Sequence, residues 1–442
     1  ITENGRPLVE LLGTLVMLGA DIVGLNCHLG PYHMIKSLKQ VPLFAQSYLS
    51  VYPNASLLSF EDDNGNGHYG FSQNADYFGK SAELLVAEGA RLIGGCCGTT
   101  PDHIRAVKCA IKGLKPVEKK FVTSMVEEAE LIKRVKSSET LVDKVKREVT
   151  IIAELDPPKT LDISKFTAGV KALDAAGISA ITLADNSLAK TRICNVSLAS
   201  LLKNEIATPL LLHLSCRDHN MIGLQSRLLG MNVLGFDNVL AITGDPSKIG
   251  DFPGATSVYD ATSFKLLELI QQLNHGQGYS GASVKKATNF TAAAAFNPNV
   301  KNLSRCGRLI ERKITSGADY FITQPIFNAD IFEELADLTK DYETPFFVGI
   351  MPITSYNNAI FLHNEVPGIQ LSEAFLAKLE AVKGDKETCQ QLALEESKRL
   401  IDRALEHFNG IYLITPFMRY DLTVELVDYI HQKVEQKQLV IS

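Results

Sequence analysis

Several features that would place the chain in a common functional class are absent from its 442 residues. The formal net charge is −6, so nothing in the charge balance supports binding to nucleic acid or to an anionic membrane. The longest apolar runs are too short to cross a bilayer, and no signal peptide opens the chain. No Walker loop or HExxH occurs. A nucleotide triphosphatase and a zinc protease therefore lack support.

The eight cysteines are scattered along the chain rather than concentrated as they are in small secreted disulfide scaffolds. Adjacent Cys96 and Cys97 are poorly placed to bridge each other. This usage predicts a reducing, cytoplasmic location. The chain begins at Ile1 rather than at a methionine, so we expect a piece of a longer polypeptide.

Length and composition predict two domains and a connector. The chain is about twice as long as a single globular domain. We predict an α/β piece over residues 1–110, a charged linker over 111–147 and a second α/β piece over 148–442. The linker is predicted because charged residues dominate it and aromatic residues nearly vanish. Within the linker, residues 127–136 have the pattern of an exposed helix.

Helical and strand patterns alternate in the first piece, as they do in a parallel sheet with crossover helices. Strands are predicted at 21–25, 46–52 and 91–94. Cys27 follows the first of these strands, and Cys96 and Cys97 follow the third, so we expect the three thiols at one rim of the sheet. Three thiolates can hold zinc with one position open for a substrate thiol. The alternative is three small buried apolar residues, and spacing alone does not decide between the two.

A second candidate metal site in this piece is rejected. Asp62, Asn64, Asn66 and Gly67 match the opening of a calcium loop, but the twelfth position is Gln73 instead of a bidentate glutamate. We therefore expect a polar hairpin or loop there.

The cysteine segments resemble the zinc-binding signatures of homocysteine S-methyltransferases. The matching residues are 24–27, Gly-Leu-Asn-Cys, and 94–104, Gly-Gly-Cys-Cys-Gly-Thr-Thr-Pro-Asp-His-Ile. The resemblance implies that Cys27, Cys96 and Cys97 bind zinc, which activates homocysteine. It also implies a complete eight-stranded barrel, of which about three strands are present here. A partial barrel has open sheet edges, so we predict little or no methyltransferase activity for this piece.

The second piece is predicted to be a closed (β/α)8 TIM barrel. Eight candidate strands, most of them separated by helical stretches, fit within its length. The predicted strands span residues 149–154, 180–184, 210–214, 239–243, 289–294, 320–323, 346–350 and 411–414. The first of these ends at Glu154, and Pro157 and Pro158 force a turn soon after it.

Polar residues follow several of these strands, at the end where barrel enzymes place catalytic groups. Singly each has a structural explanation, such as a helix cap or a satisfied buried histidine. Their shared rim position favours a functional one. The residues are Glu154, Asp185, His213, Asp245, Gln324 and Tyr356.

Four motifs of the second piece resemble those of methylenetetrahydrofolate reductase, in the family's order. They are residues 153–160, Ala-Glu-Leu-Asp-Pro-Pro-Lys-Thr; 243–245, Thr-Gly-Asp; 322–325, Ile-Thr-Gln-Pro; and 348–352, Val-Gly-Ile-Met-Pro. Leu155 and Asp156 stand where the family has aromatic residues. The pairing with a homocysteine methyltransferase segment resembles the bacterial bifunctional enzymes of methionine synthesis.

The resemblance implies an enzyme that holds FAD, is reduced by NAD(P)H and converts 5,10-methylenetetrahydrofolate to 5-methyltetrahydrofolate. Glu154 matches the general acid that protonates a folate nitrogen and opens the ring. Asp245 matches the catalytic acid beside the flavin, which tunes hydride donation. The remaining matches are Gln324, Tyr356 and Arg419 for substrate, and Thr182, His213, Tyr259, Phe296 and Lys313, beside Asp245, for FAD.

Two other functions remain open on the sequence. The barrel could bind folate without catalysis, or it could be an accessory to a homocysteine methyltransferase. The sequence also leaves open the choice between NADH and NADPH, the methyl donor, and the oligomeric state, with a homo-oligomer among the possibilities.

Overall fold

The computed structural model describes residues 7–55, 59–61, 68–70, 74–115, 117–122, 139–366 and 369–441. The chain divides into two compact units, Ile1–Glu130 and Leu131–Ser442. The expected polar loop at residues 62–67 and the expected linker helix at 127–136 lie outside the described residues.

The first unit is built on a three-stranded parallel sheet in the order β1-β2-β5, as the sequence predicts. Its strands are β1 (Ile22–Asn26), β2 (Tyr48–Tyr52) and β5 (Ala90–Ile93). Its helices are α1 (Leu8–Met17), α2 (Pro31–Leu38), α3 (Ala75–Ala87) and α4 (Pro101–Ala110). A short antiparallel pair, β3 (Ser59–Glu61) and β4 (His68–Gly70), completes the unit.

One face of this sheet forms the core of the first unit and the other is open. Val23, Leu49 and Val51 are buried against helical residues such as Leu12 and Met34. Because side chains alternate along a strand, their neighbours point the other way. Ile22 and Tyr48 on that second face are exposed. The predicted partial barrel is thus confirmed as an open sheet of three strands, one face of which is exposed at these positions within the described residues.

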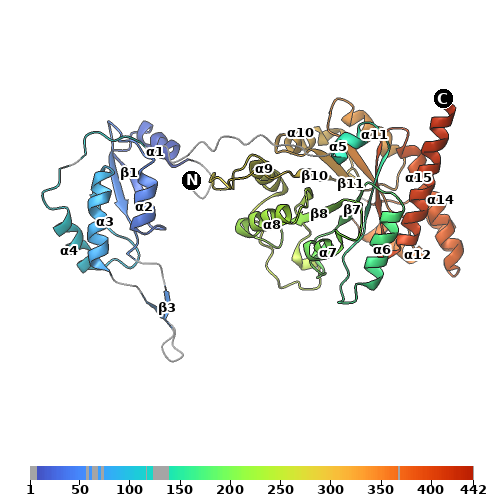
Figure 1. Cartoon of the computed structure of the whole chain (residues 1–442), viewed down its shortest axis with the longest axis horizontal. Helices are drawn as coiled ribbons and strands as arrows, with labels where there is room; N and C mark the ends of the chain where they lie inside the picture. Colours follow the sequence, from blue (N-terminus) through green and yellow to red (C-terminus); the bar gives the residue numbers. More distant parts are fainter. Residues whose placement is uncertain are drawn as a thin grey trace. The chain divides into compact units, whose positions relative to one another are not determined.

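The second unit is a closed barrel of eight parallel strands, which confirms the predicted TIM fold (Figure 1). The strands are β6 (Thr150–Glu154), β7 (Ala180–Leu183), β8 (Leu210–Ser215), β9 (Asn238–Ile242), β10 (Thr291–Phe296), β11 (Tyr320–Pro325), β12 (Phe346–Ile350) and β13 (Gly410–Ile414). Closure pairs β13 with β6, in register from Gly410 opposite Thr150 to Ile414 opposite Glu154.

Helices surround the barrel on its outside (Figure 1). They are α6 (Ser164–Ala175), α7 (Asn195–Leu202), α8 (Met221–Val233), α9 (Ser263–Asn274), α10 (Gly307–Thr315), α11 (Asp330–Thr339), α12 (Tyr356–Glu365), α13 (Glu373–Ala381), α14 (Lys386–Ala404) and α15 (Tyr420–Ile441). Short 3-10 turns follow four strands: η1 (Ser187–Ala189), η2 (Ser247–Ile249), η3 (Leu303–Cys306) and η4 (Pro416–Met418).

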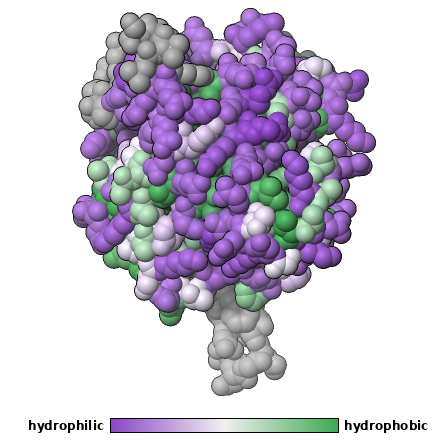
Figure 2. Space-filling model, turned by 90° about the vertical axis from the view of Figure 1, so that its right-hand side faces the viewer, coloured by the Kyte–Doolittle hydropathy of each residue, from purple (hydrophilic) through white to green (hydrophobic). Residues whose placement is uncertain are grey.

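The largest apolar cluster lies between the strands and these helices, and a smaller one fills the barrel. Figure 2 shows that the face with α14 and α15 is mostly hydrophilic, with apolar residues in small separate areas. Among the described residues, no helix is both long and apolar enough to span a membrane.

Both ends of the predicted linker are more structured than its composition suggests. The Lys120 ammonium is buried in the first unit, where it donates to the carbonyls of Leu38 and Glu88 at 2.7 and 3.0 Å. A short helix, α5 (Leu141–Val145), belongs to the barrel, because Leu141 and Val145 are buried in the interior cluster. The charged segment therefore includes one anchor for each unit.

Candidate functional site

Glu154 is the last residue of β6 and points into the mouth of the barrel. Ile152, two residues earlier, belongs to the interior cluster, and side chains two apart on a strand share a face. The backbone register places Thr182 of β7 on one side of Glu154 and Ile414 of β13 on the other. Pro157 and Pro158 follow, so the chain leaves the barrel wall directly after the acid.

Two interior side chains approach the same oxygen of this carboxyl group. The hydroxyl of Tyr412 donates a hydrogen bond to Glu154 Oε2. His213 Nε2 lies 3.8 Å from that oxygen. The Glu154 side chain is 18% exposed, so the carboxyl group remains accessible from the mouth.

Burial raises the pKa of Glu154 to about 7, and the negative charge of Asp156 adds to this effect. The hydrogen bond from Tyr412 and the charge of Arg192 act in the opposite direction. Burial also lowers the pKa of His213 to about 3. His213 is therefore neutral near pH 7, and its contact with Glu154 is not an ion pair there. A carboxyl group with this pKa can hold a proton at neutral pH and release it, as a general acid must.

Asp156 is held by residues of the loop after β7. Arg192 donates to Asp156 Oδ2 at 2.6 Å, and the Ser187 hydroxyl donates to Oδ1 at 3.0 Å. Arg192 also donates to the Pro157 carbonyl at 2.7 Å. Burial raises the pKa of Asp156, and the guanidinium of Arg192 opposes the rise. This cluster fixes the turn that carries the chain away from Glu154.

Asp245 follows β9 and supports the neighbouring loop. Its Oδ2 accepts from the Leu188 amide at 3.0 Å, and its carbonyl accepts from Arg217 at 3.1 Å. Tyr259, another expected cofactor residue, donates to the Gly244 carbonyl at 3.1 Å. Both residues therefore lie in one layer of loops at the rim.

Thr182 and His213, expected to bind the cofactor, are the buried polar residues of the mouth that lack partners. Thr182 Oγ1 and His213 Nε2 have no hydrogen-bond partner within the described parts of the chain. Buried polar atoms are nearly always hydrogen-bonded, so unpaired ones at a barrel mouth suit a ligand that would complete them.

Phe296 and Lys313, also expected to bind the cofactor, lie on the outer side of β10. Phe296 is buried between strands and helices, edge-on to Phe321 and Phe346. Lys313 reaches from α10 to the Ala295 carbonyl, and burial lowers its pKa to about 8. Both residues support β10 from outside the barrel.

The three expected substrate residues lie at different depths of the rim. Gln324 is exposed at the carboxyl end of β11. Tyr356 begins α12 and packs with the cluster formed by α12 and α13. Arg419 follows η4 and is tied to Gln390 and Asp421 at 2.7 and 2.6 Å. Of the expected residues, Glu154, Thr182 and His213 are thus brought together, and Asp245 and Tyr259 share the adjacent loops.

Two strained turns flank the strand of Glu154. Leu188 in η1 has a φ of 56°, and Phe417 in η4 has a φ of 52°, both left-handed and unusual for bulky residues. These turns follow β7 and β13, the two neighbours of β6. Leu188 is 54% exposed and Phe417 is 72% exposed. Strained backbone with exposed apolar side chains is typical of ligand-contacting segments.

Sequence reasoning missed Tyr412, Asp156 and Arg192. Tyr412 lies within a run of apolar residues that reads as plain core. A tyrosine at an inward position, two residues before a strand end, was the available signal. The pairing of Asp156 with Arg192 spans 36 positions and had no local signal.

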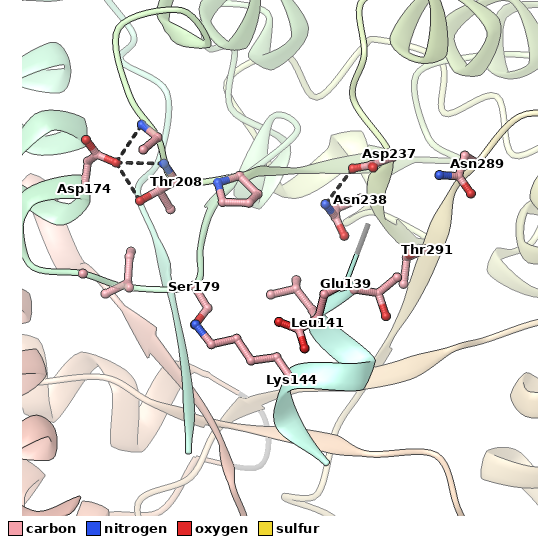
Figure 3. Close-up of a pocket in the computed structure, with 15 residues that line it drawn as sticks. Glu139, Leu141, Lys144, Asp174, Ser179, Thr208, Asp237, Asn238, Asn289 and Thr291 are labelled. Carbon is pink, nitrogen blue, oxygen red and sulfur yellow. Dashed lines mark hydrogen bonds between the residues drawn. The ribbon is translucent and has the colours of Figure 1, made fainter. Parts of the chain in front are cut away.

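A pocket of about 420 Å³ lies at the opposite end of the barrel, beside α5 and the starts of β7 to β10 (Figure 3). Its Asp174 already accepts three hydrogen bonds, from the Ala207 and Thr208 amides and the Thr208 hydroxyl. Its Glu139 is paired with Arg147. These carboxylates are engaged in holding loops, so the carboxyl-end mouth remains the candidate active site.

In the first unit, the three predicted zinc ligands do come together. One thiol sulfur each from Cys27, Cys96 and Cys97 lies within 4.8 Å of the others, and the Cys27 and Cys97 sulfurs are 3.6 Å apart. The His28 amide lowers the pKa of Cys27, whereas hydrogen bonding to Cys27 raises the pKa of Cys97. Such a cluster has the donor chemistry of a zinc site with an open position.

The loop after β2 joins the two cysteine segments. The carbonyl of Tyr52, the last residue of β2, accepts from the Cys27 amide at 3.0 Å. In the loop, the Pro53 carbonyl accepts from the Cys96 amide at 2.9 Å, and the Ala55 amide donates to the Cys97 carbonyl at 2.9 Å. Asn54 in this loop lies against the Cys27 thiol, and its buried Oδ1 has no partner among the described residues.

Comparison with known families separates the same two parts. The profile of the methylenetetrahydrofolate reductase family matches residues 139–431, which is well over half of the chain. The chain belongs to this family. A homocysteine S-methyltransferase profile matches residues 2–111, so the first part of the chain is similar to that second family.

The curated relatives match the first part. Methionine synthase of Mycobacterium leprae is 36% identical over 108 residues, which are 24% of this chain and 9% of that protein. Methionine synthase of Mycobacterium tuberculosis is 38% identical over 116 residues, 26% of this chain and 9% of that protein. The chain therefore spans only about a tenth of the length of these relatives.

Among solved structures, the reductase domain is similar to an uncharacterized protein from Clostridium thermocellum that binds two copies of 5-methyl-5,6,7,8-tetrahydrofolic acid. The two share 17% identity with a TM-score of 0.45, over 64% of this chain and 96% of that one.

Proposed function

We propose that the barrel is an FAD-dependent methylenetetrahydrofolate reductase that uses NAD(P)H and forms 5-methyltetrahydrofolate. The observation that carries the proposal is Glu154, a carboxyl group in the barrel mouth whose pKa burial raises to about 7. Ring opening of the substrate requires a proton on a folate nitrogen, and a carboxyl group that is half protonated near neutral pH can deliver it.

The chain's own residues divide this work. Glu154 delivers the proton to the folate nitrogen, the ring opens, and the resulting iminium carbon accepts the hydride. Asp156 favours the protonated form of Glu154 by its negative charge, and Arg192 limits that effect. His213, neutral near pH 7, adds no competing positive charge to the mouth.

The mouth fits a flavin. Thr182 Oγ1 and His213 Nε2 are buried without partners in the described structure, and Asp245 stands in the rim loops. FAD, when bound and reduced by NAD(P)H, supplies the hydride. Thr182 and His213 would hydrogen-bond it, and the Asp245 carboxylate would contribute negative charge at the rim.

The free-energy cost of burying the Glu154 carboxyl group favours catalysis over passive folate binding. A binding site has no need of a carboxyl group whose burial opposes its charged form. The alternative of a purely accessory barrel has no feature that favours it.

A visible absorption spectrum tests the proposal first. We expect a yellow protein whose flavin absorption is bleached by NAD(P)H and restored by methylenetetrahydrofolate. Glu154→Gln should keep the bleaching and lose the restoration. Glu148→Gln, an exposed residue just before the same strand, is the matched control and should behave as wild type. A colourless protein that FAD cannot reconstitute would refute the flavin, and full restoration in Glu154→Gln would refute the acid.

We further propose that Cys27, Cys96 and Cys97 bind zinc and present it to the thiol of homocysteine. The clustered sulfurs support this. Zinc, when bound, lowers the pKa of a coordinated thiol. We expect the three cysteines to bind the metal. We expect little or no methyl transfer by residues 1–110, because an open sheet does not enclose a substrate pocket. Metal analysis together with a methyl-transfer assay tests both statements.

A further inference from the structure

The proposed mechanism makes no use of Tyr412, a fully enclosed tyrosine of the barrel interior. It lies opposite Ile152 in the pairing of β13 with β6, and it belongs to the interior cluster. From there its hydroxyl donates to Glu154 Oε2, one pleat further toward the mouth. Packing alone would not require the hydroxyl, because a phenylalanine could fill the same space. The hydroxyl therefore matters through its hydrogen bond to Glu154.

The two oxygens of the Glu154 carboxyl group have different surroundings. Oε2 accepts from Tyr412 and faces His213 Nε2 at 3.8 Å. Oε1 has no hydrogen bond to any part of the chain that the structure describes, and it is not among the buried polar atoms without partners. Oε1 is therefore the oxygen that a molecule in the mouth can reach.

We infer that Tyr412 is a positioning residue that holds Oε2 of Glu154 and leaves Oε1 to carry and deliver the proton. The inference rests on the proposed reductase function. A donor on Oε2 fixes the plane of the carboxyl group and disfavours the proton on that oxygen. The acidic hydrogen then sits on Oε1, and proton transfer breaks the Oε1–H bond, forms an N–H bond on the folate and leaves the carboxylate hydrogen-bonded to Tyr412.

The direction of the hydrogen bond determines whether Tyr412 raises or lowers the pKa of Glu154. A donor to the carboxylate stabilises the charged form of Glu154, whereas an acceptor from the protonated acid would stabilise the neutral form. The other charged or titratable groups that act on Glu154 are Asp156 and Arg192 from the rim loops and His213 from β8. None of them changes when the Tyr412 hydroxyl is removed.

Tyr412→Phe is the test, with Tyr320→Phe as its matched control. Tyr320 is another buried tyrosine of the barrel interior, at the start of β11, and its hydroxyl has no partner within the described residues. In Tyr412→Phe the apparent pKa of the folate half-reaction should rise by about one pH unit, since a hydrogen bond to a charge is lost. The rate on the acidic plateau should fall about tenfold because the acid is no longer held. Reduction by NAD(P)H should be unchanged.

The same titration can be read without turnover. The carboxyl band of Glu154, assigned by its loss in Glu154→Gln, is followed with pH by infrared difference spectroscopy in wild type, Tyr412→Phe and Tyr320→Phe. We expect an upward shift in Tyr412→Phe alone. No shift or a downward shift overturns the inference, and so does an equal shift in Tyr320→Phe.

These outcomes separate the inference from the function. If no flavin or folate chemistry occurs but the infrared shift appears, the proposed function fails and the hydrogen bond stands. If Glu154→Gln abolishes folate reduction but Tyr412→Phe titrates as wild type, the function stands and the role of Tyr412 fails. Should Tyr412→Phe not fold, Tyr412→Met also removes the hydroxyl and carries the same prediction.

Discussion

The parallel sheet is closed in the second unit and open in the first. In the barrel, β13 pairs with β6, so every strand has two neighbours and the sheet has no edge. In the first unit, β1 and β5 are both edges, and one face of the sheet carries exposed Ile22 and Tyr48. Closure creates an enclosed mouth, whereas the open sheet offers only a rim.

The closed barrel and the open sheet support different kinds of site. The Glu154 site depends on enclosure, because Tyr412 of the adjacent β13 and His213 of β8 reach the acid inside the barrel and burial raises its pKa. The thiol cluster is held by the two cysteine loops and by the end of β2 with the loop that follows it. A ligand set can therefore form in an incomplete sheet, whereas a substrate pocket needs the closed one.

The largest expected effect is on the enclosed site. Glu154→Gln should slow folate reduction by about 10²- to 10⁴-fold, the usual contribution of a general acid. It should leave metal binding by the cysteines unchanged. Single-turnover flavin reoxidation and metal content, measured on the same preparation, check both halves. A parallel loss of metal would show that the two sites are not independent.

The open rim should respond only to its own ligands. Cys96→Ser should weaken zinc or cobalt binding by at least about 100-fold, since even outer-shell changes at metal sites typically cost 10–100-fold. Cys109→Ser is the matched control, because Cys109 on α4 is exposed and outside the cluster. Competition with a chromophoric chelator gives both affinities. Equal affinities for the two variants would contradict the ligand assignment.

Core truncations should show two separate stabilities. Leu49→Ala in β2 and Leu211→Ala in the barrel interior each remove a fully buried side chain, at a cost of about 2–5 kcal/mol in free energy of unfolding. We expect two transitions in calorimetry, with each variant lowering a different one. One shared transition that both variants lower equally would show that the units unfold together.

The smallest effect is a stability difference with pH. The folded pKa of Glu154, about 7, exceeds that of an unfolded glutamate, so its burial costs little at acidic pH. As pH rises through the folded pKa, stability is lost, to the extent of about 2–3 kcal/mol. Glu154→Gln never ionises and should be more stable than wild type at pH 8 but similar at pH 4.5. Urea unfolding of the barrel at both values measures this. A variant that is less stable at pH 8 would contradict the raised pKa.

The strands could be predicted from the sequence because most are continuous apolar runs bounded by turns. The position of Glu154 followed from one such run and from Pro157 and Pro158. The anchors inside the charged segment, Leu141, Val145 and Lys120, could not be predicted, since the apolar stretches around them are only one or two residues long. Their role depends on surfaces supplied by other parts of the chain.

The site was harder to predict than the fold. A strand residue contributes to the site only if its side chain points into the barrel, and an apolar strand sequence does not show which residues do. Phe296 and Tyr412 both sit in apolar strands, yet one faces the helices and the other faces Glu154. Alternation along β13 could have suggested the inward position of Tyr412. Nothing local predicts that Arg192 closes on Asp156, because that pairing is made by tertiary structure.

The central claim is that Glu154 holds a transferable proton at neutral pH in the mouth of the barrel. The rate of flavin reoxidation by methylenetetrahydrofolate, followed in single turnovers from pH 5 to pH 9, tests it most directly. The account predicts a rate that is constant at low pH and falls above an apparent pKa near 7, with that dependence absent in Glu154→Gln. A rate independent of pH in the wild type, or the same fall in Glu154→Gln, would contradict it.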